Sequence, residues 1–505
     1  NMIEKITSCA LEGIESQKVE VEVNISRGAK FLLVGLPDNA VKESHYRIAA
    51  ALKNIGYKIP VKEIIINLAP ADLKKEGSSY DLPIAIGILS ASGQILQGLF
   101  KDYIIMGELS LDGKLRPIKG VLSMAIKAKK MGLKGIIVPE MNVEEAQLVK
   151  GINIIGAHSL KQLIHHFQDG LKIVNKKYYS KDDFDENTLD FSDVIGQQIA
   201  KRAIEIAAAG GHNILLIGPP GSGKSMLAKR ITTILPNLNE SEMLETTKIY
   251  SYLGKFNQKN KLIYKPPFRS PHHTISDVAL VGGGTNPKPG EISLAHNGVL
   301  FLDELPEFKR RVLEVLRQPL EDGVVTISRA AGSVNFPSNL MLVAAMNPTP
   351  NGNYFDNLNS KQSFFKVQQY LSKLSQPLLD RIDLQIEVEA VSINKLTKFN
   401  RAEEDSKTIK YRVKKARDFQ YKRQGKINAH LENHDINKYC DFDAKTLNFL
   451  RSASESLNIS ARSFNRIKKI SRTIADLNVC LSIKTEHVAE ALQYRSLEKL
   501  KQFLN

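Results

Sequence analysis

One glycine-rich segment constrains this chain of 505 residues more than any other feature. It reads Gly218-Pro219-Pro220-Gly221-Ser222-Gly223-Lys224-Ser225 and matches the phosphate-binding pattern GxxxxGK[S/T]. The apolar run 213–217 before it predicts a strand, and the run 226–235 after it predicts a helix that stops before Pro236. Such a unit presents backbone N–H groups and a helix N-terminus to phosphate. The segment therefore predicts an α/β nucleotide-binding domain.

The side chains of this loop have expected roles. Lys224 should reach the β- and γ-phosphates of ATP, and Ser225 should ligate Mg²⁺. A glycine-rich turn without a ligand is the alternative, and the strand–loop–helix context disfavours it. The residues that we expect to contact the nucleotide are Gly218, Pro219, Pro220, Gly221, Ser222, Gly223, Lys224, Ser225, Met226, Asp303, Ile195 and Gly196.

A second part of the site follows the apolar run 299–302, where Asp303 and Glu304 stand side by side. Four apolar residues predict a buried strand, and open α/β sheets bind ligands at the carboxyl ends of their strands. We expect Asp303 to hold the Mg²⁺ and Glu304 to orient and polarise the attacking water. A buried strand that ends in an acidic pair by chance is the alternative.

Two more polar residues follow apolar segments. The strand predicted over 340–346 ends in Asn347, whose amide could hold the attacking water by a hydrogen bond. Arg381 stands in the turn Leu378–Asp383, and a planar guanidinium suits the spread charge of a transferring phosphoryl group. The alternative for Arg381 is a salt bridge to Asp380 or Asp383.

Four sections are expected along the chain. Residues 2–170 mix strand and helix patterns and predict one α/β domain, whereas the polar stretch 171–190 predicts a linker. Residues 191–390 carry the nucleotide motifs, and 391–505 have helical periodicity and predict a small helical domain. Strands are expected in the first section at 19–25, 31–34, 63–68 and 135–138, and helices at 39–54, 82–92 and 121–131.

Composition narrows the partners and the compartment. The net charge is +16, and residues 391–505 hold +11 of it, with 24 Lys and Arg against 13 Asp and Glu. This concentration favours an anionic partner such as DNA, with a solvated basic face as the alternative. No apolar run of about 18 residues and no signal-peptide pattern occur, so we expect a cytoplasmic protein without a membrane span. The three widely spaced cysteines predict reduced thiols.

The residues between the two nucleotide motifs resemble those of the ComM/YifB family of magnesium-chelatase-like AAA+ ATPases. They read FRSPHHT at 268–274, VGGG at 281–284 and PGEISLAHNG at 289–298. The resemblance covers essentially the whole chain. It implies a Lon-like α+β domain of the ribosomal-S5 type, a P-loop AAA+ α/β domain with a helix-2 insert, and a C-terminal helical lid.

The resemblance also implies roles for single residues. Asn347 falls at the sensor-1 position, and Arg381 resembles a finger that acts on the ATP of a neighbouring subunit in a ring. Segment 323–336 looks like the pre-sensor-1 hairpin facing the central pore, which makes Arg329 a DNA-contact candidate, with a hairpin salt bridge as the alternative. Arg462 resembles sensor 2, and Arg466, one turn later, is the competing choice.

The N-terminal section resembles the Lon protease fold at three segments, 35–44, 76–83 and 107–113. Ser79 falls where Lon carries its nucleophile, which a lysine of lowered pKa activates. Leu122 stands at the expected position of that lysine, and Lys119 is shifted by three residues. We therefore expect Ser79 to be inert and the domain to serve assembly or DNA binding.

The family resemblance implies a function and leaves alternatives. The first hypothesis is a hexameric, ATP-driven helicase that migrates DNA branches in natural transformation. Basic runs at 411–417 and 462–469 support it, and Lys468 and Lys469 are tentative DNA contacts. The alternatives are a chelatase-like remodelling ATPase that does not act on DNA, and a Lon-type protease, which Leu122 disfavours. Many members carry paired cysteines after the sensor-1 Asn; Thr349-Pro350-Asn351-Gly352 stands here, so we expect no zinc.

Overall fold

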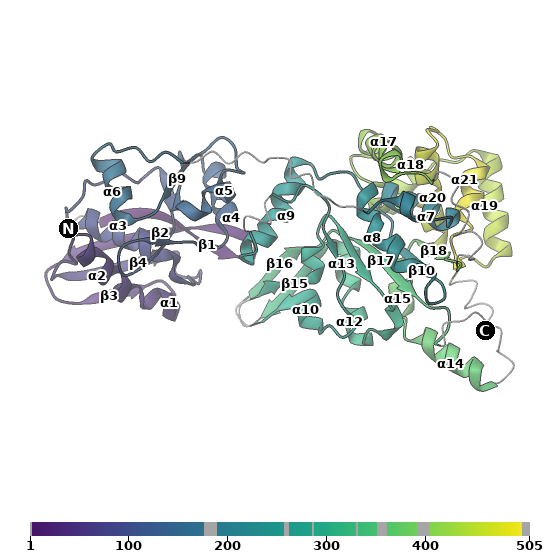
Figure 1. The fold of residues 1–505 in the computed structure, drawn as a ribbon, viewed down its shortest axis with the longest axis horizontal. Coiled ribbons are helices and arrows are strands. Elements are labelled where there is room, and N and C mark those ends of the chain that lie inside the picture. The colour runs from purple at the N-terminus through teal and green to yellow at the C-terminus, as the bar shows by residue number, and fades with distance from the viewer. Residues whose placement is uncertain are drawn as a thin grey trace. The chain divides into compact units, whose positions relative to one another are not determined.

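The structure, a computed structural model, describes residues 3–175, 189–256, 262–284, 287–329, 332–350, 361–390 and 403–496 (Figure 1). The chain forms two compact units. The N-terminal unit contains Asn1–Phe184 and Met243–Ile263, and the second contains Asp185–Glu242 and Tyr264–Asn505. The first division between the units falls after Phe184, and Met243–Ile263, within the section expected to be the AAA+ domain, belongs to the N-terminal unit.

Helix α9 (Glu240–Tyr252) carries residues 243–252 into the N-terminal unit, because its later turns pack on the core of that unit. Leu244 contacts that core, and the Lys248 ammonium forms an ion pair with Glu15. The hydroxyl of Ser251 donates to the buried carboxylate of Glu145. The amino-acid sequence of α9 alone does not predict these contacts.

The N-terminal unit contains a mixed four-stranded sheet in the order β1-β2-β4-β3. Strands β1, β2 and β4 are antiparallel, and β3 runs parallel to β4. A parallel three-stranded sheet, β5-β8-β9, and a short hairpin, β6-β7, complete the strands. Their bounds are β1 Ile3–Glu12, β2 Glu15–Ser26, β3 Phe31–Val34, β4 Glu63–Ala69, β5 Tyr103–Ile105, β6 Glu108–Leu109, β7 Leu115–Arg116, β8 Gly135–Pro139 and β9 Asn153–Ala157.

Helices join these sheets into one core. Helix α3 is buried on nearly all sides and contacts β1 and β2, and α4 contacts β2 and β8. The predicted strands and helices occur, except that the helix expected over 39–54 is interrupted at Glu43. The helices are α1 Asn39–Lys42, α2 Ser44–Asn54, α3 Asp81–Ala91, α4 Val121–Lys130, α5 Val143–Ala146 and α6 Leu160–Gln168.

A parallel five-stranded sheet forms the centre of the second unit, in the order β11-β14-β17-β10-β18. Alternate residues of its strands face two different apolar cores, so that Ile214 and Leu216 enter one and Leu215 and Ile217 the other. Burial on both faces explains why the sequence shows continuous apolar runs rather than alternation. The strands are β10 Ile214–Ile217, β11 Phe268–Arg269, β14 Val299–Leu302, β17 Met341–Met346 and β18 Leu384–Glu387.

Helices and two hairpins surround this sheet. The longer hairpin pairs β15 with β16, and the shorter one pairs β12 with β13. The hairpin strands are β12 Gly282–Gly283, β13 Lys288–Pro289, β15 Val324–Arg329 and β16 Gly332–Pro337. The helices are α7 Gln198–Gly210, α8 Lys224–Ile234, α10 Asp277–Val281, α11 Glu291–Leu294, α12 Arg310–Glu314, α13 Arg317–Asp322, α14 Lys361–Ser372 and α15 Gln376–Leu379.

The C-terminal section is helical, as its periodicity predicts. In the described residues 403–496 it forms α17 Ser406–Gln424, α18 Asn433–Tyr439, α19 Ala444–Ser456, α20 Ala461–Leu477 and α21 Thr485–Ala491. Helices α17 and α20 pack against α7 (Figure 1). Because α7 leads directly into β10, this helical lid is attached to the strand that carries the glycine-rich loop.

Candidate nucleotide-binding site

The glycine-rich loop leaves the carboxyl end of β10 and enters α8, as the sequence predicts. Gly223 precedes the helix with φ +93°, a conformation that favours glycine. A Cβ on Gly218 would lie 2.3 Å from the Val388 carbonyl oxygen, so that position also requires glycine. Above Gly221 and Gly223 an added Cβ would meet nothing within 4 Å, which leaves open space for a ligand.

Lys224 lies in the first turn of α8 and faces the loop. Its Nζ donates to the carbonyl oxygens of Gly218 at 2.7 Å and Pro219 at 2.9 Å, and to Asn347 Oδ1 at 3.2 Å. Burial lowers the pKa of Lys224, and the nearby Asp303 and Glu304 act in the opposite direction. The hydroxyl of Ser222 is also buried and has no hydrogen-bond partner within the described part of the chain. Both donors fit a phosphate acceptor.

Two oxygen donors suited to Mg²⁺ meet where β14 ends. The hydroxyl of Ser225 lies 2.6 Å from Asp303 Oδ2. Hydroxyl and carboxylate oxygens are ligands that Mg²⁺ accepts beside substrate phosphates. The residues expected to hold the metal are therefore in contact with each other, and their chemistry fits that ion.

Glu304 adopts the left-handed conformation at φ 52°, which is uncommon for a residue other than glycine. Its side chain is 58% exposed, and His273 Nδ1 lies 3.3 Å from its carboxylate. The conformation turns the chain sharply after Asp303, whose Oδ1 accepts the Glu304 N–H at 2.9 Å. Backbone strain of this kind is concentrated at functional sites.

Asn347 follows β17, the neighbour of β10, and its side chain contacts Lys224. The Tyr370 hydroxyl donates to the Asn347 carbonyl oxygen at 3.2 Å and holds this residue in place. Burial raises the pKa of Tyr370 to about 12, so the hydroxyl keeps its proton near neutral pH. The expected sensor-1 residue thus lies beside the loop lysine.

Ile195 and Gly196 lie in the turn before α7, and that turn contacts the loop through Gln197. Gln197 Nε2 donates to the Ser222 carbonyl oxygen at 3.1 Å. The Gly196 N–H donates to Glu403 Oε1 at 2.9 Å. Gln197 and Glu403 are contacts that the sequence reading missed. Gln197 could have been noticed as the residue after Gly196, but no signal points to Glu403.

Arg381 lies beyond the amino ends of β10 and its neighbour β18, whereas the glycine-rich loop leaves the carboxyl end of β10. Leu384, the first residue of β18, pairs with Ile214, the first residue of β10, and Arg381 precedes it. From there to Ile217 the strand covers roughly 10 Å at ~3.3 Å per residue, and the loop begins beyond. Arg381 therefore lies too far along the sheet to touch a phosphate in its own loop.

The partners of Arg381 differ from both expected acids. Its Nη2 forms an ion pair with Glu321 of α13, and Nη1 donates to the Pro377 carbonyl oxygen at 2.7 Å. Asp380 and Asp383 have other partners, so the local salt bridge considered for Arg381 is replaced by one to Glu321.

Arg462 and Arg466 both reach the Arg381 turn instead of the loop. Arg462 Nη1 lies 2.8 Å from Asp380 Oδ2, and Arg466 Nη1 donates to the Ile382 carbonyl oxygen at 2.7 Å. Burial raises the pKa of Asp380, but hydrogen bonds from Gln376 and Arg462 and the neighbouring arginine charges outweigh it and lower the pKa. The candidate sensor-2 residue and the candidate finger thus lie together at the amino end of β18.

The Lon-like residues of the N-terminal unit do not form a serine–lysine pair at the expected position. Ser79 lies in the turn Ser78–Tyr80, and Leu122 is fully buried in the first turn of α4. The Leu122 N–H donates to Glu145 at 2.9 Å, and Lys119 is exposed. An apolar, buried side chain at 122 cannot take the proton of a serine hydroxyl.

The candidate DNA contacts lie in different surroundings. Arg329 ends β15 and pairs with Gly332 across the hairpin, whose turn at 330–331 is outside the described residues. Lys468 lies over the rings of Phe442 and Phe464, 5.6 and 5.3 Å from their centroids. Lys469 donates to a lid carbonyl oxygen at 3.1 Å. Both lysines thus have partners inside the lid.

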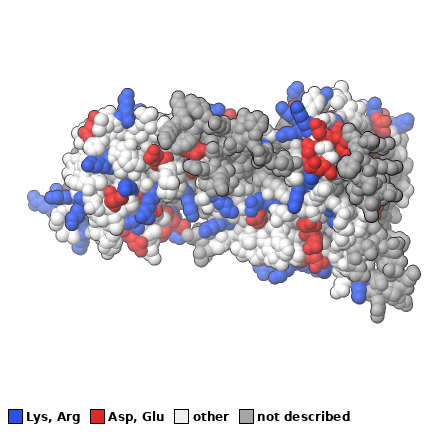
Figure 2. Space-filling view, in the orientation of Figure 1, with Lys and Arg blue, Asp and Glu red and all other residues white. Residues whose placement is uncertain are grey.

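The basic run at 411–417 is also partly internal. Arg412 pairs with Glu205 and Glu404, and Arg417 donates twice to the Ala208 carbonyl oxygen, at 2.9 and 2.7 Å. In Figure 2, Lys and Arg side chains are interspersed with Asp and Glu on the visible face. Arg412 and Arg417 of this run therefore have partners within the protein.

Known proteins are similar to this chain over nearly its whole length. Family models described as magnesium chelatase, subunit ChlI, match residues 21–142 and 190–396, and its C-terminal model matches 403–495. Competence protein ComM of Haemophilus influenzae is 46% identical over 99% of both chains. YifB of Escherichia coli is 45% identical over 97% of this chain and 96% of its own. Lon protease 2 of Bacillus subtilis is 28% identical over 148 residues, 28% of this chain and 26% of its own.

Fold and site together define a P-loop ATPase of the magnesium-chelatase-like AAA+ class. Part of the chain is also similar to Lon proteases, over 148 and 103 residues in two of them. The chain belongs to the ComM/YifB family of these ATPases. No helix among the described residues is both long and apolar enough to cross a membrane.

Replacing Glu304 with glutamine is expected to leave ATP binding intact and to slow hydrolysis by about 10²–10⁴-fold, the usual contribution of a general base. The amide keeps the shape of the side chain but cannot polarise water as a carboxylate does. Binding of a fluorescent ATP analogue and phosphate release measure the two effects. Glu307→Gln, at a half-exposed carboxylate three residues on, is the matched control. Unchanged phosphate release in Glu304→Gln would assign the water to another residue.

Proposed function

We propose that this ATPase assembles as a hexameric ring and uses ATP to migrate DNA branches during natural transformation. The observation that carries the ring is the distance between Arg381 and its own loop. A finger that cannot reach its own ATP is useful only beside the ATP of a neighbouring subunit. Arg462, which pairs with Asp380 beside Arg381, suits the same interface.

The proposed chemistry follows from the side chains at the loop. The loop amides and Lys224 bind the phosphates, Glu304 orients and polarises water, and Asn347 holds that water by a hydrogen bond. Mg²⁺, held by Ser225 and Asp303, would neutralise phosphate charge. Arg381 of the next subunit stabilises the charge that develops during transfer.

The DNA part of the proposal is supported by the ComM relative, whose name describes it as a competence protein. The β15–β16 hairpin occupies the segment for which the family resemblance implies a pore-facing hairpin, and a net charge of +16 favours a polyanion. A cytoplasmic location belongs to the same proposal. The internal partners of Lys468 and Lys469 favour the hairpin over the lid as the DNA-facing element.

A remodelling ATPase that does not act on DNA is the second candidate. The family models favour it, because all three that match are named for a magnesium chelatase subunit. The two candidates differ in what stimulates ATP hydrolysis. DNA should stimulate a helicase, whereas a chelatase-like motor should respond only to a protein partner.

We expect four-way junctions and single-stranded DNA to raise the ATPase rate several-fold, and this stimulation to fall steeply between 50 and 200 mM salt, as phosphate contacts require. Phosphate release with and without each DNA measures the effect, with Lys224→Ala protein as the background. Particle mass with Glu304→Gln protein and ATP tests the hexamer. DNA that neither binds nor stimulates at low salt would favour the remodelling ATPase.

A further inference from the structure

The turn that carries Arg381 is fixed to the amino end of β10 by Asn213. Asn213 Nδ2 donates to the Arg381 carbonyl oxygen at 2.8 Å. The Asn213 carbonyl oxygen accepts from the backbone N–H groups of Asp383 and Leu384, each at 3.1 Å. Its Oδ1 accepts from Leu342 of β17 at 2.7 Å. The candidate finger is therefore tied to the strand of the loop and to the strand of Asn347.

His212, directly before Asn213, makes the connection on the other side. Its side chain is fully buried. Nδ1 lies 3.0 Å from Asp383 Oδ2, and Nε2 lies 2.7 Å from Thr473 Oγ1 of the lid helix α20. Both ring nitrogens are thus used, one by the finger turn and one by the lid.

The fold makes room for this bridge. A Cβ on Gly210, at the end of α7, would lie 2.2 Å from His212 Nε2 and 2.6 Å from Thr473 Oγ1. Glycine at that position therefore allows the histidine and the threonine to meet. Burial raises the pKa of Asp383, but the His212 hydrogen bond and the charges of His212, Lys469 and Arg466 outweigh it and lower the pKa.

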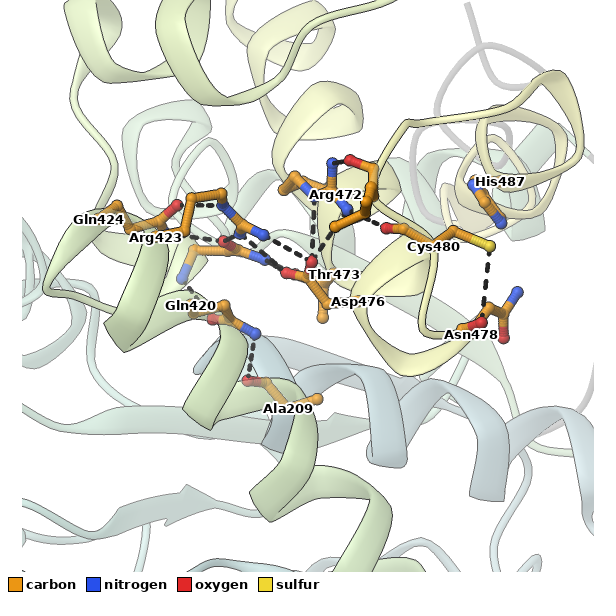
Figure 3. A network of polar contacts seen from close by, with 12 residues as sticks. Ala209, Gln420, Arg423, Gln424, Arg472, Thr473, Asp476, Asn478, Cys480 and His487 are labelled. Atoms are coloured by element: carbon orange, nitrogen blue, oxygen red, sulfur yellow. Dashed lines mark hydrogen bonds and ion pairs between the residues drawn. The ribbon is translucent and has the colours of Figure 1, made fainter.

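Thr473 is itself held in a polar network of the lid (Figure 3). Asn428 Nδ2 donates to Thr473 Oγ1 at 3.0 Å and to Asp476 at 2.9 Å. Arg423 and Arg472 both pair with the same Asp476 carboxylate, at 2.7 and 3.0 Å. The threonine is therefore a fixed anchor. The same helix α20 also holds the finger turn through Arg462 and Arg466.

We propose that His212 is a positioning residue for Arg381. Through Asp383 it fixes the turn from which the guanidinium reaches the neighbouring ATP, and through Thr473 it couples that turn to the lid of its own subunit. The inference rests on the proposed action of Arg381 between subunits. It adds that a buried residue just before β10 sets the geometry of a finger that lies at the same, amino end of that strand.

Two substitutions separate positioning from packing. Asn at 212 places a donor near the Nδ1 position and can keep the Asp383 contact, whereas Gln reaches the Nε2 position and can keep only the Thr473 contact. If His212 acts through Asp383, H212Q is the more damaging change. If His212 only fills space, H212N is the more damaging change, because asparagine leaves the larger cavity.

The experiment uses the full chain with ATP and measures kcat and KM for phosphate release. We expect H212Q to lower kcat on the order of 10²-fold with KM unchanged, since a displacement of about 1 Å at a catalytic group has that effect. H212N should keep most of the activity. Mixing H212Q with Glu304→Gln subunits should restore turnover, because the H212Q subunit supplies an intact Glu304 and the Glu304→Gln subunit supplies a correctly placed Arg381.

The outcomes distinguish the inference from the function on which it rests. If Arg381→Ala mixed with Glu304→Gln regains activity but H212Q is as active as the unsubstituted protein, only the role of His212 is overturned. A lower kcat for H212N than for H212Q also overturns that role. The same holds if mixing with Glu304→Gln subunits does not restore the turnover of H212Q. If the Arg381→Ala mixture regains nothing, the finger between subunits fails as well. Should H212Q not fold, Asp383→Asn, which keeps the side-chain shape, takes its place with the same expected results.

Discussion

Lys224→Ala is expected to lower the affinity for ATP by at least about 10²-fold and to remove measurable turnover. The Lys224 ammonium is buried against the loop and already donates to two loop carbonyls and to Asn347. Its hydrogen bonds to bound phosphate are charge-assisted, and bonds of that kind contribute up to about 3 kcal/mol each. Truncation to a methyl group leaves the phosphates without that cation.

Titration with a fluorescent ATP analogue measures this loss. Lys229→Ala is the matched control, because Lys229 lies on the same helix and is exposed. The control should bind like the unsubstituted protein. Binding by Lys224→Ala within a few-fold of that level would mean that the glycine-rich loop does not hold the phosphates.

The nucleotide elements could be predicted because their signals are local. The apolar run 299–302 is long enough to read as a buried strand, and the acidic pair follows it at once. In an open parallel sheet the carboxyl ends of neighbouring strands meet at one edge. From that rule alone, Asp303 and Asn347 are expected beside Lys224, and the structure brings them there.

Contacts between distant parts of the chain could not be predicted in this way. His212 meets Asp383 and Thr473 across 171 and 261 residues, and no periodicity connects those positions. Ser251 of α9 meets Glu145 across 106 residues in the same manner. Each of these side chains looks like an ordinary polar residue within its own segment.

Charge was the least reliable guide for the same reason. The run at 462–469 reads as a basic surface, but Lys468 lies over two aromatic rings and Arg466 holds the Arg381 turn. A long cationic side chain packs its stem on apolar surface and finds acceptors close by. Net charge therefore does not tell which residues would contact an anionic partner.

Arg381→Ala is expected to keep ATP binding and to lower turnover by about 10³–10⁵-fold, the range for an arginine finger. Arg381 is separated from its own loop by the length of β10, so its removal should leave the local ATP contacts intact. The loss should instead appear at the neighbouring subunit. Phosphate release and binding of a fluorescent ATP analogue separate the two effects, with Arg317→Ala on α13 as the control.

Mixed rings give the sharper result. A subunit with Arg381→Ala retains Glu304, and a subunit with Glu304→Gln retains the finger, so each is inactive for a different reason. Where the two stand in the right order around a ring, an intact finger faces an intact Glu304, and hydrolysis should return at that interface. If the two preparations stay inactive when mixed, Arg381 has a structural role instead. Its ion pair with Glu321 of the same chain would then explain why its removal lowers turnover.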